Sequence, residues 1–250
     1  MERVRAALVE TDPASKCALV ASLVTTEGSA TRDLSGIPGR PARPVLVDPK
    51  EVPHRGLGTI EGRAAMIHAV AHIEFNAINL ALDAAYRFSE MPAEFHADWI
   101  SVAQDEARHF GLLSARLRAL GFGYGDFTAH SGLWDAAEKT ASDVLARMAL
   151  VPRVLEARGL DVTPGIIHRF REIGDAETAA VLQVILDEEV RHVAIGTKWF
   201  RLLCAQRGID PTATFKALLA AHGMRVRLPL NREARAAAGF DAAELDAIVS

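Results

Sequence analysis

The pattern of hydrophobic and polar positions predicts an all-helical chain. From residue 61 to about residue 88, apolar residues recur at helical spacing, with Ile67 and Ile78 on the same face as Glu74. A second helix is predicted from Pro92 to about residue 120, where the sequence GFGYGD ends it. No segment shows the strict alternation that is typical of a half-buried β-strand.

The second half of the chain predicts two further long helices. One runs from Ser131, a suitable N-cap, to about residue 158, and the other runs from Asp175 to about residue 206. Thr163-Pro164 and Asp210-Pro211 each predict the start of a short helix, because proline suits the first helical turn. The fold class that follows is a four-helix bundle with additional short helices.

The two ends of the chain predict arms around this bundle. Residues 3–25 predict one short amphipathic helix, and residues 26–60 contain five prolines and five glycines, which favours an irregular segment. We therefore expect residues 1–60 to form an N-terminal helix and arm packing on the bundle, residues 61–208 the bundle, and residues 209–250 a C-terminal helix and tail.

Composition narrows the classes of protein that fit this pattern. Half of the residues are hydrophobic and only 6% are aromatic, which suits closely packed helices, and the net charge of −4 gives no indication of nucleic-acid binding. Cys17 and Cys204 lack metal-site spacing, so we expect reduced thiols. No run of 18 apolar residues predicts a membrane span, and the charged N-terminus differs from a signal peptide, so we expect a cytoplasmic protein.

One short pattern occurs twice. Residues 105–109 read DEARH and residues 188–192 read EEVRH, so each has an acid, a glutamate, a variable residue, an arginine and a histidine. A third Glu-x-x-His, from Glu51 to His54, contains a proline and lies in the irregular arm. Because the flanking acid and arginine are repeated too, the first two copies form a matched pair.

Helix geometry brings each glutamate and histidine of this pattern together. Residues three positions apart share a helix face, about 5 Å apart. The preceding helix of each pair carries its own glutamate on the apolar face: Glu74 lies 32 residues before Glu106, and Glu156 lies 33 residues before Glu189. The chain therefore contains two copies of a helix pair, with Glu on one helix and Glu-x-x-His on the next.

Four carboxylates and two imidazoles on apolar helix faces predict a dimetal centre. Buried charges are costly unless they are paired or bind a metal, and this donor set is that of carboxylate-bridged dimetal sites in helical bundles. Oxygen and nitrogen donors favour two iron ions, with Mn/Fe and Mn/Mn pairs left open. The predicted metal ligands are Glu74, Glu106, His109, Glu156, Glu189 and His192.

The residues that flank the ligands predict supporting contacts. Asp105 and Glu188 each lie one helical turn before a ligand histidine and can orient its ring. Arg108 and Arg191 can neutralise these acids, although ordinary ion pairs on the helix surface explain the arginines as well. Pro152, four residues before the ligand glutamate of its helix, predicts a kink or a break.

These motifs carry a resemblance to a known superfamily. The arrangement E-x30-DEARH and E-x31-EEVRH resembles that of ferritin-like diiron-carboxylate oxygenases, and tRNA-modifying diiron hydroxylases are similar in plan. The segments HAVAHIEFNAINLALDAAYRF, YGDFTAHSGLWDAAEKT and NREARAAAGF resemble a bacterial ferritin-like family of unknown function. The resemblance implies a ferritin-like bundle over residues 61–208, with Glu106 and Glu189 bridging the metals.

Two functions follow from such a site. The first is an O2-activating hydroxylase or monooxygenase that acts on an unknown substrate, draws on an electron donor and relies on Glu106 and Glu189 at the reacting metals. The second is iron handling, as a ferroxidase or peroxide scavenger. A metal-free helical scaffold is disfavoured because its core carboxylates would repel one another. A homodimer is also open.

Overall fold

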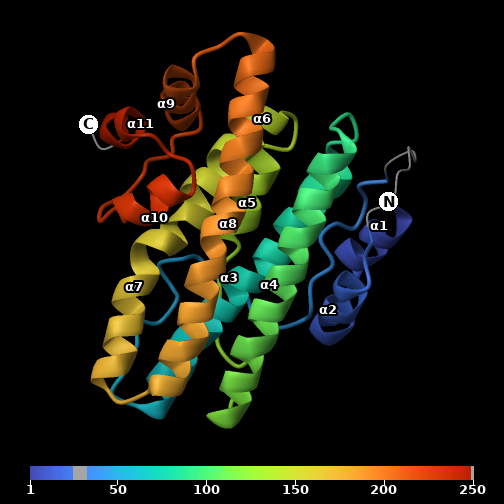
Figure 1. Cartoon of the computed structure of the whole chain (residues 1–250). Coiled ribbons are helices and arrows are strands. Elements are labelled where there is room, and N and C mark those ends of the chain that lie inside the picture. The colour runs from blue at the N-terminus through green and yellow to red at the C-terminus, as the bar shows by residue number, and fades with distance from the viewer. Residues whose placement is uncertain (25–32, 249–250) are drawn as a thin grey trace. The chain divides into compact units, whose positions relative to one another are not determined.

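The computed structural model describes residues 1–24 and 33–248, and helices dominate them (Figure 1). Within these ranges the only β-structure is an isolated bridge between Leu46 and Ala129, so the all-α prediction is confirmed. The chain divides into two compact units, residues 1–134 and residues 135–250. The predicted division into arm, bundle and tail at residues 60 and 208 stays a prediction.

Two long helices form the centre of the first unit. Helix α3 (Ile60–Arg87) begins after Thr59, whose side chain accepts a hydrogen bond from the Gly62 amide, and helix α4 (Ala93–Ala119) begins after Pro92. The two helices pack along each other, joined by a short turn. Both agree with the sequence prediction to within one or two residues at each end.

The N-terminal segment differs from its prediction. Instead of one helix there are two, α1 (Glu2–Val9) and α2 (Pro13–Ala21), which pack on α3 and α4 respectively. The prediction missed the break because Asp12-Pro13 starts a new helix, with the Asp12 carboxylate accepting from the Ser15 amide. The last predicted residue of this helix, residue 25, lies outside the described residues.

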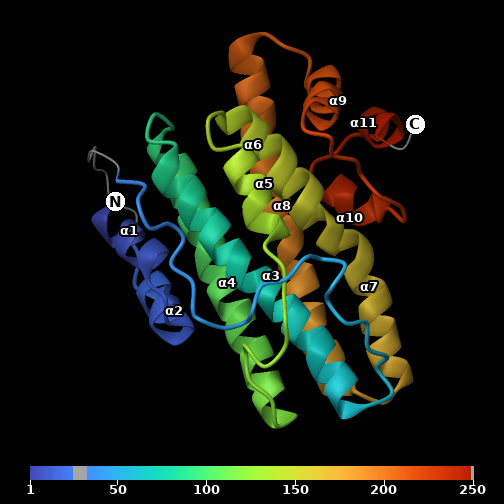
Figure 2. The same ribbon diagram turned by 180° about the vertical axis from the view of Figure 1, so that it is seen from behind.

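The described part of the arm, residues 33–59, is irregular as predicted. It is tied to the first unit by two backbone hydrogen bonds, from Val47 to the Ala129 carbonyl and from Ala129 to the Val45 carbonyl. Its residues 40–46 lie against α3, as Figure 2 lets the reader follow. The arm therefore covers one face of the helix that carries Glu74.

The predicted third long helix is broken into several pieces. It consists of α5 (Gly132–Lys139), α6 (Val144–Leu150), the π-helix η1 (Val151–Glu156) and α7 (Ala157–Glu172). The single helix predicted from residue 131 to 158 is thus wrong. Asp143 caps a new helix after the break, and the Arg147 guanidinium bonds back to the Ala137 carbonyl and the Thr140 hydroxyl.

Helix α7 continues where the sequence predicted an end at Gly159 and a new start at Pro164. Pro164 has no amide hydrogen, so the carbonyl of Leu160, one turn earlier, loses its usual helical partner. The Asn231 side chain supplies the missing donor, with a hydrogen bond of 3.2 Å to the Leu160 carbonyl. A residue far along the chain therefore makes the interior proline tolerable, which local sequence does not reveal.

The irregularity predicted at Pro152 takes the form of the π-helix η1. Helix α8 (Ala176–Arg207) packs against η1, and it presents Gly196 to the proline ring. A Cβ atom on Gly196 would lie 2.3 Å from Cγ of Pro152, so only glycine allows this approach. The widened turn ends at Glu156, and such turns commonly serve functional sites.

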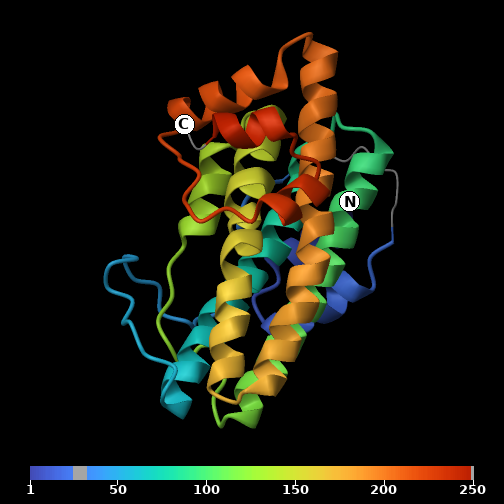
Figure 3. The same ribbon diagram turned by 60° about the vertical axis from the view of Figure 1, so that its left-hand side comes forward.

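The predictions for α8 and the helix after it are confirmed. Asp175 caps α8 by accepting from the Thr178 amide, and Gly208 ends it in the left-handed conformation at φ 64°. Helix α9 (Pro211–Ala221) follows. The tail contains α10 (Arg232–Ala237) and α11 (Ala242–Ala247), where the sequence predicted one short helix (Figure 3).

Arg153 links η1 to the C-terminal helices of the second unit. Its buried guanidinium lies 4.3–4.5 Å from the ring centroids of Phe200, Phe215 and Phe240, and it forms an ion pair with Glu244 of α11. Cation–π contacts are strongest when the cation is removed from water. This cluster therefore anchors the C-terminal segment on the π-helix that leads to Glu156.

Helix α3 is also the one described helix that is long and apolar enough to cross a membrane by length and composition. Its most apolar stretch, 18 residues with a mean hydropathy of 1.2, is 67% buried within the protein. That burial is typical of the core helix of a water-soluble protein.

Replacing Gly196 with alanine will destabilise the protein by about 1–3 kcal/mol, because the new methyl group overlaps the Pro152 ring. Urea denaturation measures the loss. Gly159→Ala is the matched control, since an added Cβ there meets no atom within 4 Å, and it should stabilise α7 by about 0.5–1 kcal/mol. Equal stability of Gly196→Ala and wild type would contradict the contact.

The buried side chain of Lys16 leads to a prediction for the first unit. Its side chain is fully buried, and its ammonium donates to the Leu8 carbonyl at 3.1 Å and to Asn79 Oδ1 at 2.7 Å. Burial lowers the pKa of Lys16 to about 7. Between pH 7 and the unfolded pKa of about 10.4, the unfolded chain binds more protons than the folded one, so stability rises with pH.

Between pH 7 and 10, the free energy of unfolding of wild type should therefore increase relative to that of Lys16→Met, by a few kcal/mol at most. Below pH 6, the difference between the two proteins should stay constant. Comparing the two proteins by urea denaturation cancels the contribution of the other titrating groups. A constant difference across the whole range would show that Lys16 keeps an ordinary pKa when buried.

Candidate metal centre

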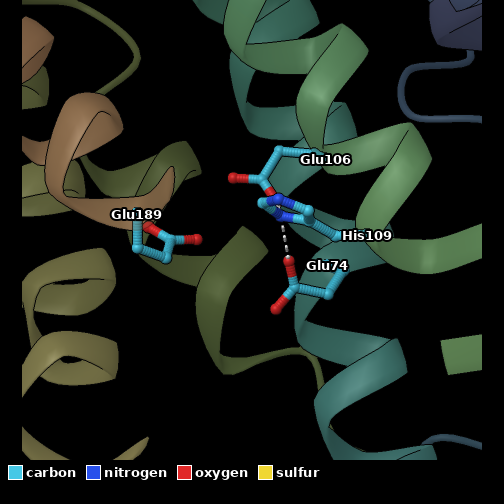
Figure 4. Close-up of side chains that lie close together, drawn as sticks. All are labelled: Glu74, Glu106, His109 and Glu189. Carbon is cyan, nitrogen blue, oxygen red and sulfur yellow. Dashed lines mark hydrogen bonds and ion pairs between the residues drawn. The ribbon is translucent and has the colours of Figure 1, made fainter. Parts of the chain in front are cut away.

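Three predicted ligands lie together in the first unit. Glu74 comes from α3, while Glu106 and His109 come from α4, and their ligand atoms lie within 4.8 Å of one another (Figure 4). His109 Nδ1 lies 3.2 Å from Glu74 Oε2 and 3.3 Å from Glu106 Oε2. The side chains are 4%, 0% and 0% exposed respectively. The helix pairing predicted from the 32-residue spacing is thus present.

The electrostatics of this cluster suit a cation. Burial alone would lower the pKa of His109, but hydrogen bonds to Glu106 and Glu74 raise it to about 10. Without a metal, the imidazole therefore keeps a proton at neutral pH and offsets part of the negative charge. A divalent ion in the same place would compensate both carboxylates and displace that proton. The donor set, two carboxylates and one imidazole, fits iron or manganese.

The second unit repeats the motif. Glu189 and His192 lie on α8, with His192 Nδ1 3.6 Å from Glu189 Oε1, and the two residues are 8% and 0% exposed. Glu156 is half-buried at the last position of η1, which packs against α8. The π-helix therefore sets the position of Glu156 beside α8. From the sequence, only a kink or a break at Pro152 was predicted.

The flanking residues are partly explained by surface contacts. Asp105 forms an ion pair with Arg108 at 3.1 Å, and the two side chains are 25% and 45% exposed. This pair is the surface alternative that the sequence left open, and it is screened by solvent. Glu188 is half-buried and Arg191 is exposed. The roles of all four in supporting the ligand histidines stay predictions.

A polar and aromatic network lies beside the first cluster. His72 Nδ1 is 2.8 Å from the Tyr124 hydroxyl, and its Nε2 is 3.2 Å from the His130 carbonyl. The Asn76 amide nitrogen lies 3.1 Å from the same Nε2, so this ring nitrogen faces both a donor and an acceptor. His68 stacks on Tyr124 and accepts a hydrogen bond from the Gly125 amide. Both histidines therefore take part in hydrogen bonds.

Desolvation keeps these two histidines uncharged. Burial lowers the pKa of His68 and of His72 to about 4. The sequence analysis did not single out Asn76, whose amide donates to the His72 carbonyl at 2.7 Å. Its signal was available, since His68, His72 and Asn76 are polar residues at four-residue spacing on a largely apolar helix.

Comparisons with known proteins place the chain in a family. The family described as "Protein of unknown function (DUF455)" matches residues 9–246. An "Uncharacterized protein" from Haemophilus influenzae is 42% identical over 266 residues, which covers 98% of this chain and 92% of the relative. No solved structure matches the chain.

Removing the carboxylates around His109 should lower its pKa. In metal-free wild type, the ring NMR signals of His109 should titrate near pH 10, because both glutamates stabilise the imidazolium. In the double variant Glu74→Gln, Glu106→Gln, the two effects that raise the pKa of His109 are removed. Burial then remains, and the pKa of His109 should fall below 6.5.

Glu61→Gln is the control, because it removes an exposed carboxylate of α3 that pairs with Arg55. It should leave the titration of His109 unchanged. If the double variant still titrates near pH 10, the two glutamates do not face the ring in solution.

Proposed function

The chain belongs to the DUF455 family, and we propose that it is a ferritin-like diiron-carboxylate protein whose two helix pairs together hold the metals. In this proposal Glu189 of α8 joins Glu74, Glu106 and His109, and Glu156 and His192 complete the set. Manganese in one or both positions is the variant that the donor atoms allow.

The observation that carries the proposal is the buried cluster of Glu74, Glu106 and His109. Two carboxylates in a helical core are costly unless they are paired or bind a cation. The same set, two glutamates and one histidine, recurs on η1 and α8 at nearly the same spacing. Two half-sites, each with an excess of carboxylate, are best compensated when they share two metal ions.

Each ligand residue would have a distinct part. Glu106 and Glu189 would bridge the two ions, as the resemblance implies, while Glu74 and Glu156 would each bind at one ion. His109 would bind through a neutral ring nitrogen, since metal binding displaces the proton that it shares with the glutamates. The buried surroundings of Glu106 and His109, both 0% exposed, would keep bulk water from the reacting atoms.

We propose an O2-dependent hydroxylase or monooxygenase reaction. Two bound ferrous ions supply the capacity to reduce O2. One oxygen atom enters a C–H bond of the substrate to give an alcohol, and the other leaves as water with two protons and two electrons from a reduced donor. The cavity lined by the arm and α3 supports a substrate beyond O2. A cytoplasmic location and a homodimer are proposed with it.

The alternative is iron handling, as a ferroxidase or a peroxide scavenger, because the same ligands serve both functions. An iron store and an oxygenase differ in particle size and in the number of irons per chain. An iron store is a very large particle that accumulates many irons per chain, whereas an oxygenase keeps two. Size-exclusion chromatography of the iron-loaded protein separates them.

Iron content per chain tests the proposed site. After anaerobic loading with Fe(II) and removal of excess metal, wild type should retain about two irons per chain, the number that this ligand set holds. Glu106→Gln should lose most of this iron, because it removes a bridging carboxylate while keeping the volume of the side chain.

Glu61→Gln serves as the control, since it changes an exposed carboxylate of α3 that pairs with Arg55 and should retain the wild-type iron content. Circular dichroism of each metal-free variant checks that it folds. Iron at background level in folded wild type would overturn the proposal, and so would equal iron in Glu106→Gln and wild type.

A further inference from the structure

A cavity of about 340 Å³ lies in the first unit, between the arm and α3. Residues 40–42 and 44–46 of the arm line one side, His72, Phe75 and Asn76 of α3 line another, and Tyr124 closes it. Its size falls in the range of sites that hold small organic molecules. The arm therefore shapes a defined site as well as covering the helix.

The cavity carries a single charge. Arg40 is its one lining cation, and no acidic side chain is among the lining residues. The guanidinium lies 5.9 Å from the ring centroid of Trp134 and is half-buried. Within the part of the chain that the structure describes, no ion pair engages Arg40. A half-buried cation without an acid favours an anionic ligand, and one guanidinium matches one carboxylate.

The rest of the lining is apolar or neutral. Val45, Leu46 and Phe75 provide hydrocarbon and aromatic surface. The Tyr124 hydroxyl is hydrogen-bonded to His72 Nδ1, so this pair presents an uncharged hydroxyl and ring faces to the cavity. Such a lining suits an apolar body of a few carbon atoms, and the charged end of the ligand would lie at Arg40.

The cavity adjoins the ligand cluster through aromatic rings. Phe75 follows Glu74 in α3 and is packed 5.4 Å, centroid to centroid, from Phe110, which follows His109 in α4. Phe110 in turn lies 4.9 Å from Tyr124. A molecule in the cavity would thus touch Phe75, which follows Glu74 and packs on the residue that follows His109.

We propose that this cavity binds a small organic carboxylate, with the carboxylate at Arg40 and an apolar or aromatic body against Phe75 and Val45. Binding of the carboxylate stands on the cavity alone. The further assignment, that this carboxylate is the substrate oxidised at the metal centre, rests on the proposed function.

Calorimetric titration of the metal-free protein tests the binding. The probes are 3-phenylpropionate, 3-phenylpropanol and 3-phenylpropylammonium, which share one body and differ in charge. We expect the carboxylate to bind about tenfold or more tightly than the alcohol, and the ammonium not to bind. Equal binding of carboxylate and alcohol, or no binding of any probe up to about 10 mM, overturns the proposal.

Three variants locate the site. Arg40→Gln should reduce the affinity for the carboxylate to that for the alcohol. Arg43→Gln removes the same charge from an exposed arm residue outside the lining, and it should change neither the affinity for the carboxylate nor the affinity for the alcohol. Ala42→Trp adds bulk at an exposed lining position and should lower the affinity for both the carboxylate and the alcohol. Equal loss of affinity in Arg40→Gln and Arg43→Gln would show non-specific attraction and overturn the site.

Iron loading of the same proteins keeps the two proposals separate. Arg40→Gln should take up as much iron as wild type, because Arg40 is not among the proposed ligands. Carboxylate binding without iron uptake by wild type would overturn the proposed function and leave the cavity as a binding site. Iron uptake without a preference for the carboxylate would overturn the cavity proposal and leave the metal centre.

Discussion

The constraint on which the rest of the structure depends is the burial of carboxylates in helical cores. Glu74 and Glu106 are at most 4% exposed, and an oxygen of each lies within 3.3 Å of His109 Nδ1. Glu189 and His192 repeat the situation on α8. Such groups destabilise a fold unless something neutralises them. A shared pair of metal ions, as proposed above, would neutralise both clusters at once.

The surrounding packing serves to hold these glutamates. In the first unit, α3 and α4 carry the cluster and the arm covers α3. In the second unit, the approach of Pro152 to Gly196 and the Arg153–Glu244 pair hold the π-helix that ends at Glu156. The C-terminal helices therefore act on the candidate site indirectly, by fixing the backbone that carries the proposed ligand Glu156.

Much of this arrangement follows from sequence because it is local. Local signals can be recognised in the sequence itself, such as the helix cap at Asp175, the helix end at Gly208 and the i,i+3 spacing of Glu106 and His109. The errors arose where distant residues decide. Pro164 stays inside a helix because Asn231 satisfies the carbonyl that it leaves without a donor, and the cavity at Arg40 forms only where the arm meets α3. Neither contact has a local signature.

The central claim is that the two helix pairs bind one pair of metal ions. A crystal structure of the iron-loaded protein, with anomalous data collected at the iron edge, tests this most directly. The account predicts two iron positions about 3.5–4 Å apart, both in contact with Glu106 and Glu189. A single iron bound by Glu74, Glu106 and His109 alone, with Glu189 and His192 turned elsewhere, would contradict it.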